Sequence, residues 1–502
     1  MNMFDKKNNM KTKILMIALV LMVCSACKKS FLELEPKTRV TANLSYITED
    51  DYRQAVTGIY ASLLGLYNDA YVMGEMRSDN ANYVFNATIS GGQFISKYEI
   101  ASFIDVPNNF NTKNKFVFCY QGISRANAVL KRIDASSINA TLKSNLKGQA
   151  EFLRAFYYFE LVQYYGDVPL YLTDLSEVNN VAETKLPRAP KADVYKQILA
   201  DATDAANLLP NTPVVKGQVA KGAAKMLLGY VYMTLKQYAD AERVLKEVTT
   251  LGYSLLPDYA SIFLPANKNN AESIFEVQYL QGNFGLQNGI VYQLLPAASQ
   301  TVNLTGIVGN NQTTGGWNVP SADLIAAYEA NDKRKAVSIA TSYIDGSGNT
   351  VQQVYVKKYL NLPHFQYNNT NDDWPVYRYA DALLLLAESL NEQGKNAEAI
   401  TYLDQVRTRA GITTYALSGQ TDLRAAIAKE RRVELAFENH RWLDLVRTGQ
   451  AITVMNAYGA KLKPTRPDIS PLAFNVTANR LIFPIPQDEL NLNNLLTQNP
   501  GY

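Results

Sequence analysis

Histidine, cysteine and tryptophan are scarce in this chain of 502 residues, which has 2 His, 3 Cys and 3 Trp. Because only His364 and His440 carry imidazoles, a multi-histidine metal site is excluded, and no HExxH pattern or Cys cluster is present. The GxSxG and P-loop patterns are also absent. The sequence does not exclude a pair of catalytic carboxylates of the glycosidase type, because the chain has so many acidic residues. We therefore expect no enzyme activity, no metal and no cofactor.

An excess of charge of one sign is also lacking. The chain has 49 basic and 46 acidic residues, and residues 1–26 hold four of the lysines and one of the aspartates. The remaining chain therefore carries 45 residues of each sign. This balance gives no electrostatic reason to expect binding to nucleic acid.

Long apolar runs are confined to the start of the chain. Lysines precede the apolar stretch Ile14–Cys24, which is too short for a permanent transmembrane helix and predicts a signal peptide over residues 1–26. The following Ser-Ala-Cys resembles a bacterial lipobox, so we expect an acylated Cys27 as the sole membrane anchor. A plain cleavable signal with an incidental Cys27 is the alternative. If Cys27 is acylated, Cys119 lacks an intrachain disulfide partner, and we expect it to be a small buried side chain.

Aromatic residues are abundant, with 32 Tyr beside 18 Phe, and many of them fall in the stretch Gly148–Leu170. Its apolar side chains recur at helical spacing around most of the circumference, which predicts a buried central helix. They are Phe152, Leu153, Phe156, Tyr157, Phe159, Leu161 and Tyr164.

Few positions of this helix are left for solvent, and we expect Glu151, Arg154, Glu160 and Gln163 there. Gly166 suits the left-handed conformation that ends a helix.

A weak internal repeat predicts two helical hairpins of the tetratricopeptide kind, in which small residues let helices cross closely. The matched positions are Leu228, Gly229, Tyr232, Ala241, Val244, Leu245 and Val248 in one copy, and Leu386, Ala387, Leu390, Ala399, Tyr402, Leu403 and Val406 in the other. Residues 271–279 alternate like a strand between the copies. The following stretch, 281–319, is rich in Gly, Asn, Gln and Thr, and such long loops are usually functional or disordered.

The last long helix begins near Thr421 and is predicted to continue through Leu445. Its dense charges could be catalytic, but helix neighbours pair in this way routinely, and we favour a structural set of ion pairs that includes Glu438–Arg441 and Asp444–Arg447.

Several ordered stretches resemble the SusD/RagB family of outer-membrane nutrient-binding lipoproteins. They are FLRAFYYFELVQYYGDVPL, RAPKADVYKQILAD, AESIFEVQY, WPVYRYADALLLLAES, KERRVELAFENHRWLDLVR and RLIFPIPQDELNLNNLLTQNPGY. The resemblance implies a mainly α fold, with a body of four tetratricopeptide-like units, an irregular ligand-binding half and a few short strands. It also implies a single domain over residues 27–502, with an N-terminal helical part to residue 260 and a loop-rich remainder from residue 261.

The same resemblance implies a cell-surface protein, anchored to the outer membrane by lipid, that binds a glycan and hands it to a TonB-dependent transporter of the SusC type. Two alternatives remain at this point. The protein could be a peptide-binding member of the family, or a tetratricopeptide scaffold lipoprotein on the periplasmic side. A scaffold would not need the long polar loops that carry aromatic residues.

Two loop regions, 79–94 and 284–317, place aromatic residues next to amides, and the resemblance implies a ligand site in such loops. We expect Trp317 to stand out after two glycines as a stacking platform, although a Trp that fills a core gap is the alternative. The candidate ligand-binding residues are Trp317, Tyr83, Phe85, Asp79, Asn80, Phe284 and Tyr292.

Overall fold

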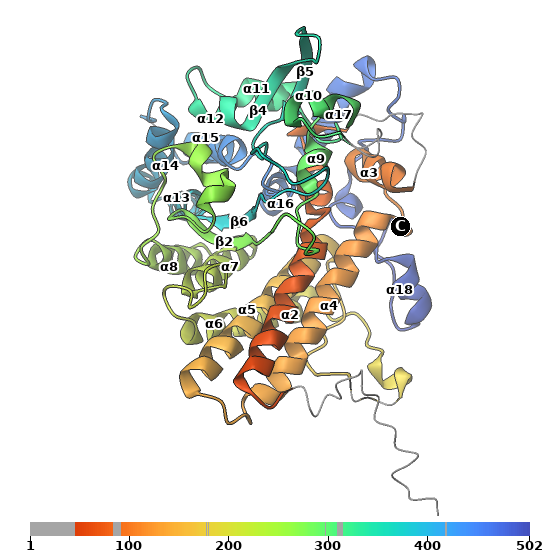
Figure 1. The fold of residues 1–502 in the computed structure, drawn as a ribbon, viewed down its shortest axis with the longest axis vertical. Helices are drawn as coiled ribbons and strands as arrows, with labels where there is room; N and C mark the ends of the chain where they lie inside the picture. The colour runs from red at the N-terminus through yellow and green to blue at the C-terminus, as the bar shows by residue number, and fades with distance from the viewer. Residues whose placement is uncertain are drawn as a thin grey trace, which may run out of the picture. The chain divides into compact units, whose positions relative to one another are not determined.

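Helices dominate the computed structural model, and its strands are short, which confirms the mainly α fold class (Figure 1). The structure describes residues 46–83, 92–176, 178, 180–296, 298–308, 315–416 and 419–502. The expected signal peptide and Cys27 lie outside the described residues. Residues Tyr52–Tyr502 form one compact unit.

The elements follow one another along the chain in an order that begins and ends with helices. The α-helices are α2 (Glu49–Tyr67), α3 (Gly92–Ser102), α4 (Phe110–Ile133), α5 (Ala140–Tyr165), α6 (Lys191–Leu208), α7 (Lys221–Thr234), α8 (Tyr238–Val248), α9 (Ile290–Leu294), α10 (Ala298–Thr305), α11 (Ala322–Ala327), α12 (Lys333–Ser338), α13 (Tyr379–Glu392), α14 (Asn396–Ala410), α15 (Gln420–Glu434), α16 (Arg441–Arg447), α17 (Ala451–Leu462) and α18 (Gln487–Leu492). The strands are β1 (Ala81–Asn82), β2 (Ser273–Val277), β3 (Val319–Pro320), β4 (Ile339–Ile344), β5 (Thr350–Val356) and β6 (Trp374–Arg378). A single π turn, η3 (Val72–Met76), follows α2.

The central helix predicted from the sequence is α5, and α4 and α6 pack against it. The Asn139 side chain caps its start by accepting hydrogen bonds from two backbone N–H groups, and Gly166, with a φ of 72°, ends it. The Phe156 ring lies 5.9 Å from the Phe275 ring and 6.2 Å from the Tyr377 ring, measured between centroids. Aromatic packing therefore joins α5 to the strands β2 and β6, and the buried central helix is confirmed.

The three charged side chains that we expected on a solvent face of α5 are buried instead. Glu151, Arg154 and Glu160 are only 6, 9 and 8% exposed. Two of them have partners on the neighbouring helices, since Arg154 donates to Asp201 of α6 and Lys115 of α4 donates to Glu160. Because opposite charges compensate for the lost hydration, α5 can be buried on nearly all sides.

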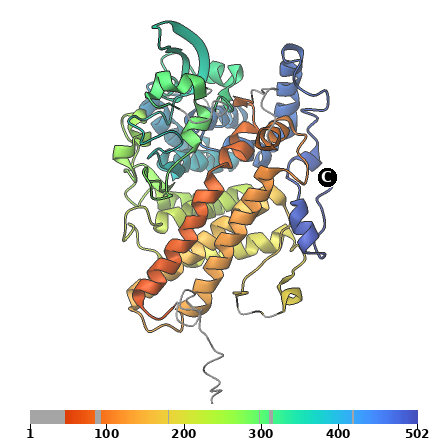
Figure 2. The same cartoon turned by 45° about the vertical axis from the view of Figure 1, so that its right-hand side comes forward.

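Both copies of the internal repeat form helical hairpins, namely α7 with α8 and α13 with α14. A Cβ atom on Gly229 would lie 2.7 Å from the Leu245 side chain, so the glycine permits the close crossing of α7 and α8. The two hairpins lie in one continuous array, in which each helix from α4 to α8 packs on the next and α8 packs on α13 (Figure 2). The predicted tetratricopeptide-like hairpins are confirmed.

The described residues contain three pairs of antiparallel strands, two of which join segments that are distant in sequence. β2 pairs with β6, as the alternating residues 271–279 predict for β2, and the chain runs directly from β6 into α13. β1 pairs with β3, so Ala81 faces Pro320 and Asn82 faces Val319. β4 and β5 form a hairpin.

The last long helix is broken, although the sequence predicts that it continues. α15 ends at Glu434, and α16 begins at Arg441. In the connection Phe437 and Asn439 have φ values of 67° and 71°, in the left-handed region. Neither residue is a glycine, so the sequence has no strong signal for this turn.

The break changes the ion pairs. The expected pair Asp444–Arg447 forms, with an N–O distance of 2.7 Å. The expected partnership of Glu438 with Arg441 is wrong, because Glu438 contacts Lys358 and Arg378. Arg441 instead contacts Asp79, a residue far away in sequence.

Candidate functional site

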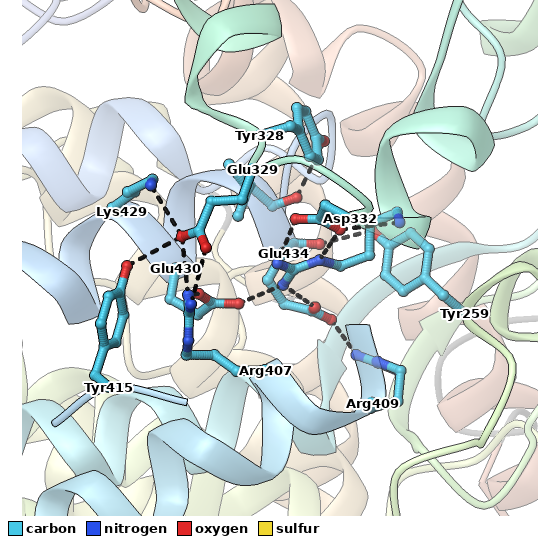
Figure 3. Close-up of polar contacts among 12 residues, drawn as sticks. Tyr259, Tyr328, Glu329, Asp332, Arg407, Arg409, Tyr415, Lys429, Glu430 and Glu434 are labelled. Carbon is cyan, nitrogen blue, oxygen red and sulfur yellow. Dashed lines mark hydrogen bonds and ion pairs between the residues drawn. The ribbon is translucent and has the colours of Figure 1, made fainter. Parts of the chain in front are cut away.

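The conspicuous charges of α15 belong to a buried network of ion pairs (Figure 3). The Arg334 guanidinium, which has no exposed surface, lies 2.7, 2.6 and 2.8 Å from carboxylate oxygens of Asp332, Glu430 and Glu434. Arg407 contacts Glu430 from the other side at 2.8 Å. Each charge in this group therefore faces a partner of opposite sign.

Glu434, which is in contact with three arginines in this network, is not suited to act as an acid or base in catalysis. Burial opposes ionisation of Glu434, but Arg409, Arg378 and Arg334 hold the pKa of its carboxyl well below the usual range. A general acid or base needs a pKa near the working pH and access to a substrate. Glu434 is fully buried and has neither property. The charges are therefore structural, as we favoured.

Asp79 and Asn80, two of the candidate ligand contacts, take part in internal hydrogen bonds. Arg441 donates to both carboxylate oxygens of Asp79, at 2.8 and 3.0 Å. Burial raises the pKa of Asp79, but Arg441 and Arg432 lower it further, so the carboxylate stays ionised. The Asn80 amide donates to Glu75 at 2.9 Å and accepts from Arg432 at 2.8 Å. Both residues thus hold the segment after η3 against α15 and α16.

We expected Trp317 to stand out into solvent. Its side chain instead lies in the interior and is only 6% exposed. Its ring meets the Phe94 ring edge-on, with 5.2 Å between centroids. The Lys97 ammonium lies 4.8 Å from the centroid of the Trp317 ring, within the range of a cation–π contact. Trp317 therefore packs the segment that leads into β3 against α3.

Tyr83 and Tyr292 are also buried, and each phenol has a partner. The Tyr83 hydroxyl donates to the Phe94 carbonyl at 2.9 Å. The Tyr292 hydroxyl lies 3.0 Å from Nδ1 of His364, one of the two histidines of the chain. Phe85 lies outside the described residues. Tyr83 thus connects the segment after β1 to α3, and Tyr292 connects α9 to the loop that contains His364.

Phe284 is the one candidate among the described residues whose side chain is mainly exposed, at 69%. It lies in the loop between β2 and α9, and its ring covers Gly282, where a Cβ atom would be 3.1 Å from the ring. The backbone of this loop turns back on itself through a bridge between Leu280 and Leu286. Both of these leucines are exposed as well.

A second loop, residues 360–371, lies beside the first and carries an exposed aromatic residue that the sequence reasoning missed. Phe365 is 51% exposed, and Leu362 is exposed beside it. The backbone N–H of Phe365 donates to the Gln281 side chain at 3.1 Å. The Asn369 amide holds both backbone groups of Gly282, at 2.8 and 2.9 Å. The two loops therefore form one unit.

We call the exposed apolar side chains of these joined loops the aromatic platform. It consists of Leu280, Phe284, Leu286, Leu362 and Phe365. A signal for Phe365 was present in the sequence, because its neighbours are amides and a proline, like the polar neighbours of Phe284. Exposed aromatic residues on loops that are fixed by hydrogen bonds can bind a ligand without first becoming ordered.

The described residues contain no group of three or more His, Cys, Asp or Glu side chains that could hold a metal ion. Across the same part of the chain, every helix is too short or too polar to span a bilayer.

Comparison with known proteins places the chain in a family. A family model described as "SusD family" matches residues 334–502, and one described as "Starch-binding associating with outer membrane" matches residues 30–233. SusD-like protein P2 of Formosa agariphila is 30% identical over 417 residues, which cover 75% of this chain and 77% of that protein. The chain belongs to the SusD family.

Other members match over nearly the full length of this SusD-family chain. SusD-like protein P25 of Formosa agariphila is 26% identical across 97% of this chain and 99% of that protein. A solved structure described as a laminarin-binding SusD-like protein is 26% identical, with a TM-score of 0.73, and covers 91% of this chain and 100% of its own. The mainly α fold is thus that of the family.

The two family models leave residues 234–333 between their matches. Phe284, Tyr292 and Trp317 all fall in this interval. Loops that carry binding residues vary more than the elements that support them. In this SusD-family protein, three of the five residues of the exposed apolar platform therefore lie in the interval that neither family model matches.

Proposed function

We propose that this SusD-family protein binds a glycan on the aromatic platform and delivers it, without chemistry, to a SusC-like TonB-dependent transporter of the outer membrane. The observation that carries the proposal is the pair of exposed phenylalanines, Phe284 and Phe365, on two loops tied together by hydrogen bonds. The description of one structural relative as laminarin-binding supports a glycan as the ligand.

The chemistry of the platform fits a sugar. The C–H face of a pyranose packs on an aromatic ring, and its hydroxyls need hydrogen-bond donors and acceptors at the ring's edge. Exposed amides flank both rings, with Asn283 and Gln287 beside Phe284, and Gln366 and Asn368 beside Phe365. An amide offers both a donor and an acceptor, as a hydroxyl requires.

Trp317, Tyr83, Tyr292, Asp79 and Asn80 enter the same proposal in a supporting place. Tyr292 contacts His364 of the second platform loop. The other four hold neighbouring segments against α3, α15 and α16. Phe85 stays a proposed contact that lies outside the described residues. The lipid anchor on Cys27 and exposure at the cell surface are further parts of the proposal, and the outer-membrane description of one matching family model supports them.

Affinity electrophoresis through gels that contain laminarin or starch tests the binding site. Phe284→Ala and Phe365→Ala should each reduce retention by the polysaccharide that holds the wild-type protein, with a loss of affinity of about tenfold or more. Phe110→Ala is the matched control, because Phe110 is a partly exposed phenylalanine on α4. Equal retention of all three variants would contradict the assignment of the site.

Delivery to a transporter is tested by purifying the native protein from its own membranes in mild detergent. A barrel protein of the TonB-dependent class should co-purify with it. Purification of the intact lipoprotein alone would count against this part of the proposal.

A further inference from the structure

Several stretches of the chain contain no Asp, Glu, Lys or Arg, and three of these stretches carry candidate ligand-binding residues or the aromatic platform. These three are residues 80–96, 277–322 and 359–371, of 17, 46 and 13 residues. Charged residues make up 19% of the whole chain, so 76 residues of average composition would include about 14 charged ones. Such a complete absence over segments rich in Gly, Asn, Gln and Thr differs from an ordinary polar surface, which mixes both signs of charge.

The fold brings the described parts of the three uncharged stretches together. The first pairs with the second where β1 meets β3, and Phe94 of the first packs on Trp317 of the second. The second pairs with the third where the backbones of Asn288 and Thr370 exchange two hydrogen bonds of 3.1 Å. Tyr292 and Tyr367 add a ring contact between the second and third stretches, with centroids 4.5 Å apart. The aromatic platform lies within the second and third stretches.

The charged residues that border these stretches have partners of their own among the described residues. Such a partner keeps each of these charges from acting as an open site for a charged ligand. The pairs are Asp79 with Arg441, Lys97 with Asp69, Asp323 with Lys461, and Lys358 with Glu438, while Glu276 accepts from the Asn269 N–H and Asp372 accepts from the Asn361 amide.

From this we infer that the ligand is an electrically neutral glycan, without uronate, sulfate or amine groups on its bound sugars. The inference rests on the proposed function and narrows its substrate class. Binding a carboxylate or sulfate to a protein surface removes water from the anion, which costs hydration free energy. A cation or several hydrogen bonds must compensate for this cost. The uncharged stretches supply no cation for an acidic glycan and no carboxylate for a basic one. Aromatic faces and amides are sufficient for neutral hydroxylated rings.

Affinity electrophoresis of the full mature protein against a panel of polysaccharides tests this inference. The neutral probes are laminarin, starch, galactomannan and xyloglucan, the anionic probes are alginate, polygalacturonate and chondroitin sulfate, and chitosan is the cationic probe. We expect retention by one or more neutral probes only. Because no charge pair forms, the dissociation constant should change by less than about twofold between about 50 and 500 mM NaCl.

Three outcomes are distinguishable. Retention confined to neutral probes, with this weak salt dependence, supports the inference. Retention by an anionic or cationic probe that salt abolishes overturns it, while the proposed binding of a glycan stands. Passage through all eight gels without retention overturns the proposed function, and the inference falls with it.

Discussion

At the scale of single residues, exposure divides the candidate aromatic residues into two kinds with opposite expected behaviour. Phe284 and Phe365 stand on the surface, whereas Trp317 is packed against Phe94 and below the Lys97 ammonium. Removing an exposed ring should change binding and leave stability nearly unchanged. Removing a buried ring should change stability first.

Trp317→Ala should lower the free energy of unfolding by about 3–5 kcal/mol, the usual cost of deleting a large buried aromatic side chain. Urea unfolding followed by circular dichroism measures this loss, with Phe284→Ala as the control that should stay within about 0.5 kcal/mol of the wild type. A Trp317→Ala protein of wild-type stability that no longer binds polysaccharide would instead make Trp317 a ligand contact.

Glu75 in η3 gives the clearest prediction for pH. Burial raises the pKa of its carboxyl to about 7, despite hydrogen bonds from Asn80 and the Phe437 N–H. Between about pH 4.5 and 7 the folded chain therefore holds a proton that the unfolded chain has lost. The contribution of Glu75 to the free energy of unfolding is therefore most favourable at low pH, and it declines as the pH rises through that window.

Glu75→Gln removes this titration, so the variant should lose less stability than the wild type between pH 5 and 8, by about 2 kcal/mol. Urea unfolding at both pH values measures the difference. Asp204→Asn, which changes an exposed carboxylate on α6, should follow the wild type. If the free energy of unfolding changes equally with pH in Glu75→Gln and the wild type, the pKa of the Glu75 carboxyl is not raised in the folded protein.

At the scale of elements, close helix crossings depend on particular glycines. A Cβ atom on Gly122 of α4 would lie 2.2 Å from the Tyr157 ring of α5, and that ring is fixed by a 2.8 Å hydrogen bond to the Ile59 carbonyl. A Cβ atom on Gly58 of α2 would instead point into open space, without a contact within 4 Å. The same substitution should therefore have opposite effects at the two sites.

Gly122→Ala should destabilise the protein by about 1–3 kcal/mol, because the added methyl group forces α4 and α5 apart. Gly58→Ala should stabilise it by about 0.5–1 kcal/mol, because alanine favours a helix over the unfolded chain. Thermal unfolding of the two variants provides the comparison. A stable Gly122→Ala protein would mean that α4 and α5 do not cross so closely.

The sequence predicts elements well where periodicity is strong. The core helix α5, the two matched hairpins and strand β2 all follow from the spacing of apolar residues. The break between α15 and α16 does not, because its left-handed positions are occupied by Phe437 and Asn439. The Phe437 backbone is held there by distant residues, since its N–H donates to Glu75 and its carbonyl accepts from the Tyr359 hydroxyl. The burial of Arg154 and Glu160 is likewise invisible to periodicity, since their partners lie on other helices.

At the scale of the whole molecule, the candidate site is assembled from segments that the sequence cannot place side by side. The sequence of its own loop predicts Phe284 as a candidate contact. Phe365 becomes a candidate only in the structure, where Asn288 pairs with Thr370 and Gly282 with Asn369, so that the two loops lie together. Tyr292 is buried and contacts His364 of the second loop, a partner that its own stretch of sequence does not indicate. Local composition thus predicts the kind of residue at a binding surface but not the partner loop.

Membrane attachment belongs to this scale as well. Cys27→Ala should release the protein into the soluble fraction, because a lipid on this residue is the proposed anchor. Cell fractionation with mass spectrometry of the mature chain checks the result. Cys119→Ala, which alters a buried thiol, is the control that should stay with the membrane. Membrane association of Cys27→Ala with an unchanged mass would refute lipidation at this site.

The most direct test of the binding site is a structure of the protein with an oligosaccharide of the polysaccharide that retains it. Our account predicts a sugar ring over Phe284 or Phe365, with its hydroxyls about 3 Å from the exposed amides beside them. An oligosaccharide bound instead in the groove of about 590 Å³ between α13, α15 and α16, or in the groove of about 370 Å³ on α4, would contradict it.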